Sequence, residues 1–358
     1  MYRAYLTLLL ALIAPAIGVI LGLALWLEPL AGDLTRLGGY SENAFGWRGR
    51  QQVFVPSLAQ AANPNGRYDI IVIGDSFSWR TSADQQTRVG AFWTDFLAAS
   101  TGASVGVFDV HALGIDGIFK TPAYVEHPPG LIILELVERS LQNALAAAGS
   151  CGGAVPEIPL ATPSDPRTHP TQTYERARSG GSPRRGVGEA VNYLRKNLPR
   201  WIAGEDLTPV VALTLDRSDL FSNQEPKTLL TYEDDFKKSQ WTAADIEAIR
   251  CHLLRLQSRI ESNGRTGFLF LMAPDKSSAY SPYLHKRPDW KETLPMLIAG
   301  SALHAPRADL ALRSAIADLV RDVYLPNDTH WGTAGSRVAA DAVVGYLREN
   351  YLRGPSRR

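Results

Sequence analysis

The chain has 358 residues, of which 45% are hydrophobic and 20% are charged, so it can bury a substantial core in one large domain or two small ones. Its formal net charge is +1, and it contains no long basic run and no internal repeat. This balance excludes a bulk electrostatic attraction to nucleic acid, so we expect no nucleic-acid partner.

An uncharged, almost entirely apolar segment of 24 residues extends from Ala4 to Leu27, with Arg3 before it and Glu28 after it. A helix of this length crosses a hydrocarbon core of about 30 Å. Because Arg3 favours a cytoplasmic N-terminus, residues 1–27 are predicted to be a single-pass inner-membrane anchor with the rest of the chain periplasmic or otherwise extracytoplasmic. A cleaved signal peptide is the alternative, although its apolar core is usually only about 7–15 residues long.

Beyond the anchor, the composition divides the chain into three further parts. Residues 28–66 contain the aromatic segment Phe45-Gly46-Trp47 and are expected to be a linker that packs on the domain. The domain is expected over residues 67–350, with an insertion rich in Gly, Pro, Ser, Thr and Arg around residues 148–190. Residues 351–358 are expected to be a tail.

Short apolar runs and helical patterns alternate through the domain. The apolar runs predict strands at residues 68–73, 105–110, 131–136, 210–215 and 268–272, and helical spacing recurs near residues 89–97, 187–202, 243–262, 308–321 and 333–350. Such an alternation is typical of an α/β fold with a mostly parallel sheet that is covered on both faces.

The first chemical signal is Gly74-Asp75-Ser76, which directly follows the first predicted strand. Sites in open α/β sheets form at the carboxyl ends of strands, so Ser76 is a candidate nucleophile whose own backbone N–H can help to hold an oxyanion. The alternative is a turn in which Asp75 or Ser76 only caps a helix.

The second signal is Asn327-Asp328-Thr329-His330-Trp331, just before the last predicted helix. A serine hydroxyl needs a general base near neutral pH, and His330 can supply it while Asp328 orients the imidazole ring. A surface histidine beside a capping aspartate and a pair of metal ligands are the alternatives. Since no further cluster of His, Cys or Asp accompanies the pair, we expect neither a metal nor another cofactor.

Together these segments resemble the SGNH/GDSL hydrolase superfamily, in which the serine lies in the first sequence block and the aspartate and histidine lie in the last. The tight Asp-x-His-Trp form resembles the branch of alginate O-acetylation proteins of the AlgJ/AlgX kind. Similar short segments are Phe45-Gly46-Trp47-Arg48, Glu138-Arg139-Ser140 and Met272-Ala273-Pro274-Asp275-Lys276, followed by Tyr280. The resemblance implies an SGNH, flavodoxin-like three-layer sandwich, in addition to the N-terminal membrane helix.

The sequence departs from the family pattern in two ways, and the second departure leaves the oxyanion donors open. In the alginate proteins the Asp-x-His segment precedes the serine, whereas here it follows. The usual Gly-x-Asn-Asp block is absent, and Arg139 is a candidate donor in its place, with a structural salt bridge as the alternative. Gly114 corresponds best to the second-block glycine that lends a backbone N–H, and Gly117 is the second choice.

Other residues near these motifs are candidates for substrate binding. They are Asp75, Lys276, Tyr280 and Trp331; Asp75 is also expected to hold the turn, and ordinary core or surface roles are equally open for Lys276 and Tyr280. Cys151 and Cys251 are the only cysteines and form a possible disulfide in an exported protein, with two separate thiols as the alternative.

The resemblance implies a Ser-His-Asp enzyme that transfers an acyl group, expected to be acetyl, to an exported or cell-surface polysaccharide. A multi-span membrane O-acyltransferase is the expected partner that delivers the acyl donor, because no soluble acetyl-CoA is present outside the cytoplasm. A carbohydrate or acetyl esterase of the same fold is the first alternative. A non-catalytic scaffold or glycan-binding component of a polysaccharide export complex is the second.

Overall fold

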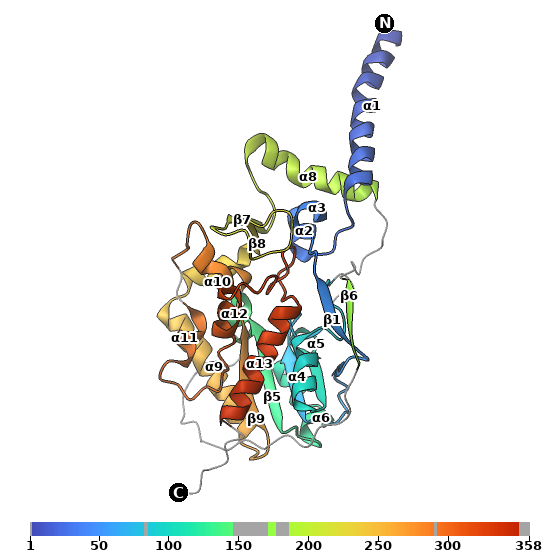
Figure 1. Ribbon diagram of the computed structural model, residues 1–358. Coiled ribbons are helices and arrows are strands. Elements are labelled where there is room, and N and C mark those ends of the chain that lie inside the picture. The colour runs from blue at the N-terminus through green and yellow to red at the C-terminus, as the bar shows by residue number, and fades with distance from the viewer. Residues whose placement is uncertain (1, 82–84, 146–170, 177–185, 290–291, 351–358) are drawn as a thin grey trace.

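The computed structural model describes residues 2–81, 85–145, 171–176, 186–289 and 292–350 (Figure 1). Helix α1 (Tyr2–Trp26) projects away from the rest of the molecule, and none of its residues is buried. Of the described helices, α1 alone is long and apolar enough to cross a membrane, a property that signal sequences share. The predicted N-terminal apolar helix is therefore confirmed.

A five-stranded parallel sheet forms the centre of the domain. Its strands lie in the order β2 (Ala59–Ala61), β4 (Val105–Asp109), β3 (Ile70–Gly74), β5 (Leu131–Val137) and β9 (Gly267–Ala273). Every residue of β3, β5 and β9 is buried, as expected for uninterrupted apolar runs in a sheet that is covered on both sides.

Because side chains alternate along a strand, β3 contributes to two separate cores. Ile70 and Val72 face the first core, which is closed by α4 (Trp93–Thr101), α12 (Ala308–Ala317) and α13 (Thr333–Asn350). Ile71 and Ile73 face the second core, which is closed by α5 (Val110–Ile118), α6 (Pro122–Val125), α7 (Leu141–Leu145), α9 (Ala243–Glu261) and α11 (Thr293–Ile298). The α/β expectation, with helices on both faces of a parallel sheet, is confirmed.

The expected strand at residues 210–215 does not join this sheet, which corrects the prediction. β7 (Val210–Thr214) instead pairs antiparallel with β8 (Thr228–Tyr232). Val210 is buried with Leu34 and Leu230 in a small third core, whereas Ala212 and Thr214 remain exposed. An apolar run can thus form either a buried strand of the parallel sheet or one strand of a half-exposed hairpin. The composition of the run alone does not distinguish these two structures. The sequence also did not reveal β2, whose three residues Ala-Gln-Ala carry no strand signal.

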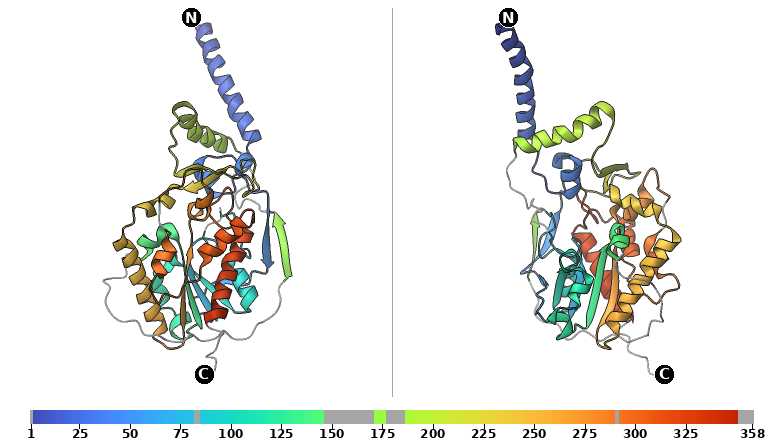
Figure 2. Two further views of the ribbon diagram at one scale, coloured as in Figure 1. Left: turned by 60° about the vertical axis from the view of Figure 1, so that its left-hand side comes forward. Right: turned by 180° about the vertical axis from the view of Figure 1, so that it is seen from behind.

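The segment after α1 packs on the domain. It contains α2 (Asp33–Gly38), α3 (Glu42–Phe45) and β1 (Arg50–Val55), and β1 pairs antiparallel with β6 (Thr171–Arg176). Trp47 donates its indole N–H to the carboxylate of Asp322 at 2.9 Å. Two further views show α2 and α3 at the end of the molecule from which α1 projects (Figure 2).

The remaining described elements are short, apart from one long helix. They are the 3₁₀ turns η1 (Glu138–Ser140), η2 (Glu233–Gln240) and η3 (Ser281–Tyr283), helix α10 (Lys276–Tyr280) and the long helix α8 (Val187–Ala203). Most of the expected insertion lies outside the described residues, as does Cys151. Cys251 lies half-buried on α9, so the disulfide between the two cysteines stays a prediction.

Candidate active site

The candidate nucleophile lies on a tight turn at the carboxyl end of β3. Gly74 ends the strand, and a Cβ at this position would lie 2.3 Å from Oγ of Ser78, so only glycine fits. The carboxylate of Asp75 accepts the backbone N–H of Phe77 at 2.9 Å and that of Val137 at 3.1 Å. Asp75 thereby ties the turn to the end of β5 and holds Ser76 at the edge of the sheet.

The structure brings Ser76 together with both of its predicted partners, although 254 positions separate Ser76 from His330. Nε2 of His330 lies 2.7 Å from Oγ of Ser76, and Nδ1 lies 2.5 Å from Oδ1 of Asp328. The same Asp328 oxygen also accepts the backbone N–H of His330 at 3.0 Å. The three side chains thus form a continuous hydrogen-bonded chain, the arrangement that general-base activation of a hydroxyl requires.

Burial and neighbouring charge have opposite effects on the pKa values of Asp328 and His330. Burial by itself would raise the pKa of Asp328, but the charge and hydrogen bonds of His330 outweigh it and lower the pKa of this carboxyl. Burial by itself would lower the pKa of His330, but Asp328 outweighs it and raises the pKa of the imidazole. The pair therefore favours a carboxylate that stabilises an imidazolium, as a general base needs after it has accepted a proton.

Asp33, at the start of α2, is a site residue that the sequence did not reveal. Its carboxylate accepts the backbone N–H of Thr329 at 2.8 Å and the hydroxyl of Thr329 at 2.6 Å, and it lies 3.9 Å from Nδ1 of His330. The backbone N–H of Asp33 donates to Asp328 at 3.2 Å. Burial and the charge of Asp328 raise the pKa of Asp33 to about 6, although His330 lowers it in part. No motif marks Asp33, because it lies in the segment between α1 and the domain.

A second residue of this segment fastens α2 to the loop that carries His330. One carboxylate oxygen of Glu42 accepts the backbone N–H groups of Ala31 and Gly32, and the other accepts the side-chain amide of Asn327 at 2.8 Å. In return, the carbonyl oxygen of Asn327 accepts the N–H of Leu34 at 3.1 Å, at the start of α2. The first residues after α1 are thus part of the scaffold of the site.

Lys276 packs against the loop that carries His330, which favours the core role that the sequence left open. Only 1% of it is exposed, and Nζ donates to the backbone carbonyls of Leu325, Pro326 and Asp328 at 2.7, 3.0 and 3.1 Å. Burial lowers the pKa of Lys276 to about 7. Lys276 therefore fixes the backbone of the loop from below.

The other three candidates for substrate binding are also buried, and a role for them in binding substrate stays a prediction. Asp75 holds the turn, as described above. Tyr280 is fully buried and its hydroxyl accepts the N–H of Tyr324 at 3.4 Å. Trp331 is buried with its ring edge-on to Phe77, at 4.9 Å between ring centroids, and Phe77 in turn packs against the ring of His330 at 4.8 Å.

The two candidate oxyanion donors besides Ser76 lie in different parts of the structure: Arg139 in an ion-pair cluster and Gly114 at a cavity. The guanidinium of Arg139 pairs with Asp275 at 3.0 Å and with Asp235 at 3.4 Å, which favours the structural salt bridge over the role of oxyanion donor. Gly114 has a φ of 65° inside α5, and with Gly117 it lines an open cavity of about 1010 Å³. Neither Ser76 nor His330 lines that cavity, and the oxyanion role of Gly114 stays a prediction.

Glu135 occupies the place where the family's asparagine block is missing. It is fully buried on β5, and its carboxyl accepts the hydroxyl of Ser78 at 2.7 Å and the backbone N–H of Asp75 at 3.2 Å. Burial, together with the charge of Asp75, raises the pKa of Glu135 well above its usual range. Glu135 therefore supports the turn of Ser76 from behind, and it offers no donor to substrate from that position.

The imidazole of His330 and two side chains beside it are of types that bind cations. Ligand atoms of Asp33, Asp328 and His330 lie within 4.8 Å of one another. Tetrahedral ligands at about 2.1 Å from a zinc ion are about 3.4 Å apart. Nδ1 of His330 and Oδ1 of Asp328 are only 2.5 Å apart, so they share a hydrogen bond and leave no space for an ion between them. These residues, as they are arranged, do not fit a metal.

The comparisons with known proteins concern the fold and the C-terminal part of the chain. No curated protein and no solved structure shows a significant match to the chain. A family model does match, over residues 220–357, which include Asp328 and His330 but not Ser76. The parallel sheet with helices on both faces is the corresponding SGNH-like fold. Residues 220–357 match the model described as the SGNH hydrolase-like domain of the acetyltransferase AlgX, which confirms the predicted resemblance to the AlgX-like branch of the SGNH proteins.

Proposed function

We propose that this protein is a serine-dependent O-acyltransferase that transfers an acyl group, expected to be acetyl, to an exported or cell-surface polysaccharide. The AlgX-like SGNH domain supports an acetyltransferase or hydrolase type of activity on polysaccharide. The observation that carries the proposal further is the 2.7 Å contact between Oγ of Ser76 and Nε2 of His330, with Asp328 on the opposite ring nitrogen. A protein that only binds glycans has no need of this hydrogen-bonded chain.

In the proposed reaction, His330 takes the proton of Ser76 while Oγ attacks the carbonyl carbon of an acyl ester. The backbone N–H groups of Ser76 and Gly114 stabilise the oxyanion of the tetrahedral intermediate; one such donor typically contributes about 10²–10³ in rate. When the intermediate collapses, His330 returns the proton to the leaving alcohol, and the acyl group stays on Ser76. A sugar hydroxyl then attacks the acyl-enzyme while His330 accepts its proton. When this second intermediate collapses, the ester of the sugar leaves and His330 returns the proton to Oγ of Ser76.

Transfer and hydrolysis differ only in whether a sugar hydroxyl or water attacks the acyl-enzyme. The proposed location favours transfer: α1 is taken as an inner-membrane anchor and the domain as periplasmic, where nascent polysaccharide passes. No soluble acetyl-CoA is present there, so we propose a multi-span membrane O-acyltransferase as the partner that delivers the acyl donor. A carbohydrate or acetyl esterase is the second candidate, favoured by the same geometry.

The full-length protein in detergent tests the nucleophile. Incubation with a fluorophosphonate probe and with p-nitrophenyl acetate is expected to label and acylate the wild type, whereas Ser76→Ala should lose both signals. Ser239→Ala, which changes an exposed hydroxyl bonded only to the carbonyl of Phe236, is the matched control and should behave like the wild type. Equal labelling of the wild type and Ser76→Ala would remove Ser76 as the nucleophile and favour the scaffold.

A second measurement separates the two enzymatic candidates. The acylated protein is offered an unmodified oligosaccharide, and the products are read by mass spectrometry for new O-acyl esters. Formation of such esters supports the transferase. Rapid loss of acetyl groups from an acetylated glycan, without transfer to any acceptor, would favour the esterase.

A further inference from the structure

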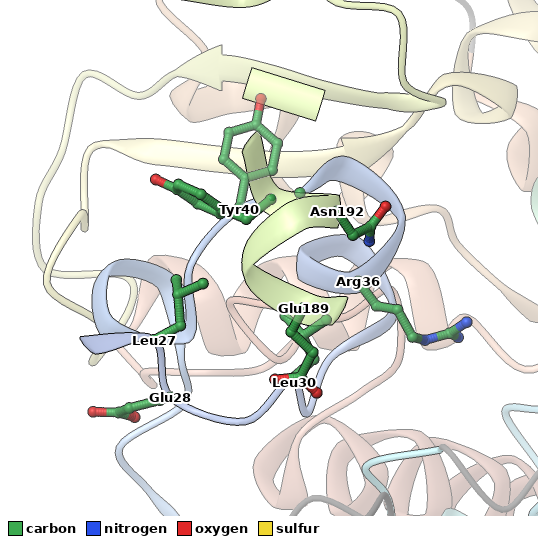
Figure 3. Close-up of a pocket in the computed structure, with 9 residues that line it drawn as sticks. Leu27, Glu28, Leu30, Arg36, Tyr40, Glu189 and Asn192 are labelled. Carbon is green, nitrogen blue, oxygen red and sulfur yellow. The ribbon is translucent and has the colours of Figure 1, made fainter. Parts of the chain in front are cut away.

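Helix α8 is attached to the domain through its polar side. Nζ of Lys196 donates to the carbonyl oxygens of Arg36 and Leu37 at 2.6 and 2.8 Å, and the side-chain amide of Asn197 donates to that of Gly39 at 2.7 Å. These carbonyls belong to the last turn of α2, where cationic and donor side chains satisfy free carbonyl groups. Figure 3 shows two further polar side chains of α8, Glu189 and Asn192, in a pocket that residues of the segment after α1 also line.

The opposite side of α8 is apolar and faces away from the domain. The exposed fractions of its side chains range from 45% to 81% for Val187, Val191, Leu198, Trp201 and Ile202. These residues share one face at helical spacing. Helices at the surface of a water-soluble domain show the reverse arrangement, with the apolar face against the core and the polar face in solvent. α8 is therefore amphipathic with its apolar face outward.

The position of α1 indicates what covers this apolar face. α1 and α8 contact each other, and in the ribbon views α8 lies across the base of α1, between the projecting helix and the domain (Figures 1 and 2). If α1 spans a bilayer, the membrane surface begins near Trp26, where α1 ends. Trp26 and Trp201 are both more than half exposed, and tryptophan is enriched at the interface between lipid and water.

We propose that α8 is an in-plane membrane helix, with its apolar face inserted at the boundary between headgroups and acyl chains of the leaflet that α1 leaves. Helices of this kind combine a polar face with an apolar face that carries Trp and Leu side chains, and they lie parallel to the bilayer. The proposal rests on α1 being a retained anchor. Lipid is the expected occupant of the apolar face, because this face of α8 is turned away from the domain and α1 also projects away from the domain.

The arrangement also fixes where the candidate active site lies. α8 binds the C-terminal end of α2, and the N-terminal end of α2 carries Asp33, which is bonded to the loop of His330. Trp26 and Asp33 are seven positions apart, so even a fully extended chain would place them at most about 25 Å from each other. The reaction centre is thereby held close to the membrane surface, where an acyl donor delivered from the bilayer arrives.

Photo-crosslinking in the full-length protein tests the proposal. p-Benzoylphenylalanine is placed at position 198 or 202 on the exposed face of α8, where a large aromatic side chain disturbs no packing. The protein is reconstituted into vesicles of phosphatidylethanolamine and phosphatidylglycerol, irradiated and analysed by mass spectrometry. We expect lipid adducts at both positions, about tenfold above those at Val125, a 64% exposed residue on α6 at the far end of the domain.

Position 12 in the middle of α1 separates failure of the anchor from failure of the proposal. Lipid adducts at position 12 without adducts at 198 and 202 would overturn the in-plane helix while the anchor stands. Absence of adducts at all three positions would overturn both. A crosslink from position 202 to a second protein in native membranes, without a lipid adduct in vesicles, would show that α8 binds a partner protein and would also overturn the proposal.

Discussion

The carboxylate of Asp33 lies 3.9 Å from Nδ1 of His330, so the imidazole is next to two acidic side chains, Asp33 and Asp328. Asp328 makes the direct hydrogen bond to the ring, whereas Asp33 bonds Thr329 beside it. Asp33 thus contributes both a charge near the general base and a brace for the loop. These two contributions are separable by experiment, because one affects the pKa of His330 and the other affects its position.

The substitution Asp33→Asn is expected to shift the pH dependence of the reaction. Asp33 is one of the charges that raise the pKa of His330. His330 accepts a proton only when it is neutral, so activity falls as the pH drops below the pKa of His330. Removing the charge lowers that pKa, so the acidic limb of the plot of kcat/KM against pH should move to lower pH.

The control for this shift is Asp219→Asn, which changes a half-buried carboxylate that pairs with Arg217. Its pH profile should coincide with that of the wild type. A profile of Asp33→Asn that drops in height without moving along the pH axis would mean that Asp33 acts only by holding Thr329.

The substitution Asp328→Asn is expected to lower kcat by about 10³–10⁴ without unfolding the protein. An amide at this position cannot stabilise the imidazolium, and its N–H₂ group would orient the ring in the wrong tautomer. Hydrolysis of p-nitrophenyl acetate gives kcat, and circular dichroism checks the fold. Asp318→Asn, at an exposed position, is the control; an unchanged kcat for Asp328→Asn would contradict the assignment of the acid.

The substitution Lys276→Met should destabilise the protein by about 2–5 kcal/mol, because it leaves three buried carbonyl groups without their donor. The loop with His330 loses its support, so activity should fall as well. Denaturant unfolding measures the free energy of unfolding. Lys286→Met, which changes an exposed lysine, should stay within about 0.5 kcal/mol of the wild type. A similar small effect of Lys276→Met would show that the loop does not depend on this lysine.

A buried ion cluster beneath the site gives a further stability prediction. Nζ of Lys238 lies 2.8 Å from Asp275 and 3.1 Å from Glu138, and all three side chains are buried. Burial by itself would raise the pKa of Glu138, but Lys238 outweighs it and lowers the pKa. Lys238→Met leaves Glu138 without this cation, while Asp275 keeps its pair with Arg139, and the change should cost about 3–5 kcal/mol of unfolding free energy.

The neighbouring residue provides the matched control for this cluster. Lys237 is exposed and pairs only with Asp234, so Lys237→Met should change the unfolding free energy by about 0.5 kcal/mol or less. Because the lowered pKa of Glu138 contributes stability above its usual value of 4.5, the difference between wild type and Lys238→Met should shrink as the pH falls through the pKa of Glu138. Equal stability of the two variants at neutral pH would contradict a structural role of the cluster.

The sequence allowed the three hydrogen-bonded residues to be predicted because each lies in a short motif at a strand or helix boundary. Ser76 follows a wholly apolar run, and Asp328 and His330 directly precede a long amphipathic pattern. Asp33 could not be found in this way, since its partner Thr329 lies 296 positions away and neither residue has a local signal. For Lys276 the sequence left a core role and a substrate-binding role equally open, because burial of a lysine depends on backbone carbonyls that only the folded loop presents.

The position of Asp33 and Glu42 has a practical consequence for work on the isolated domain. A fragment designed from the compositional boundary would begin near residue 67 and would lack both side chains that brace the loop of His330. A fragment that begins directly after Trp26 removes α1 and keeps both. Crystallisation or assay of a form without α1 should therefore start from the latter boundary, and comparison of the two fragments would reveal how far residues 27–66 complete the candidate site.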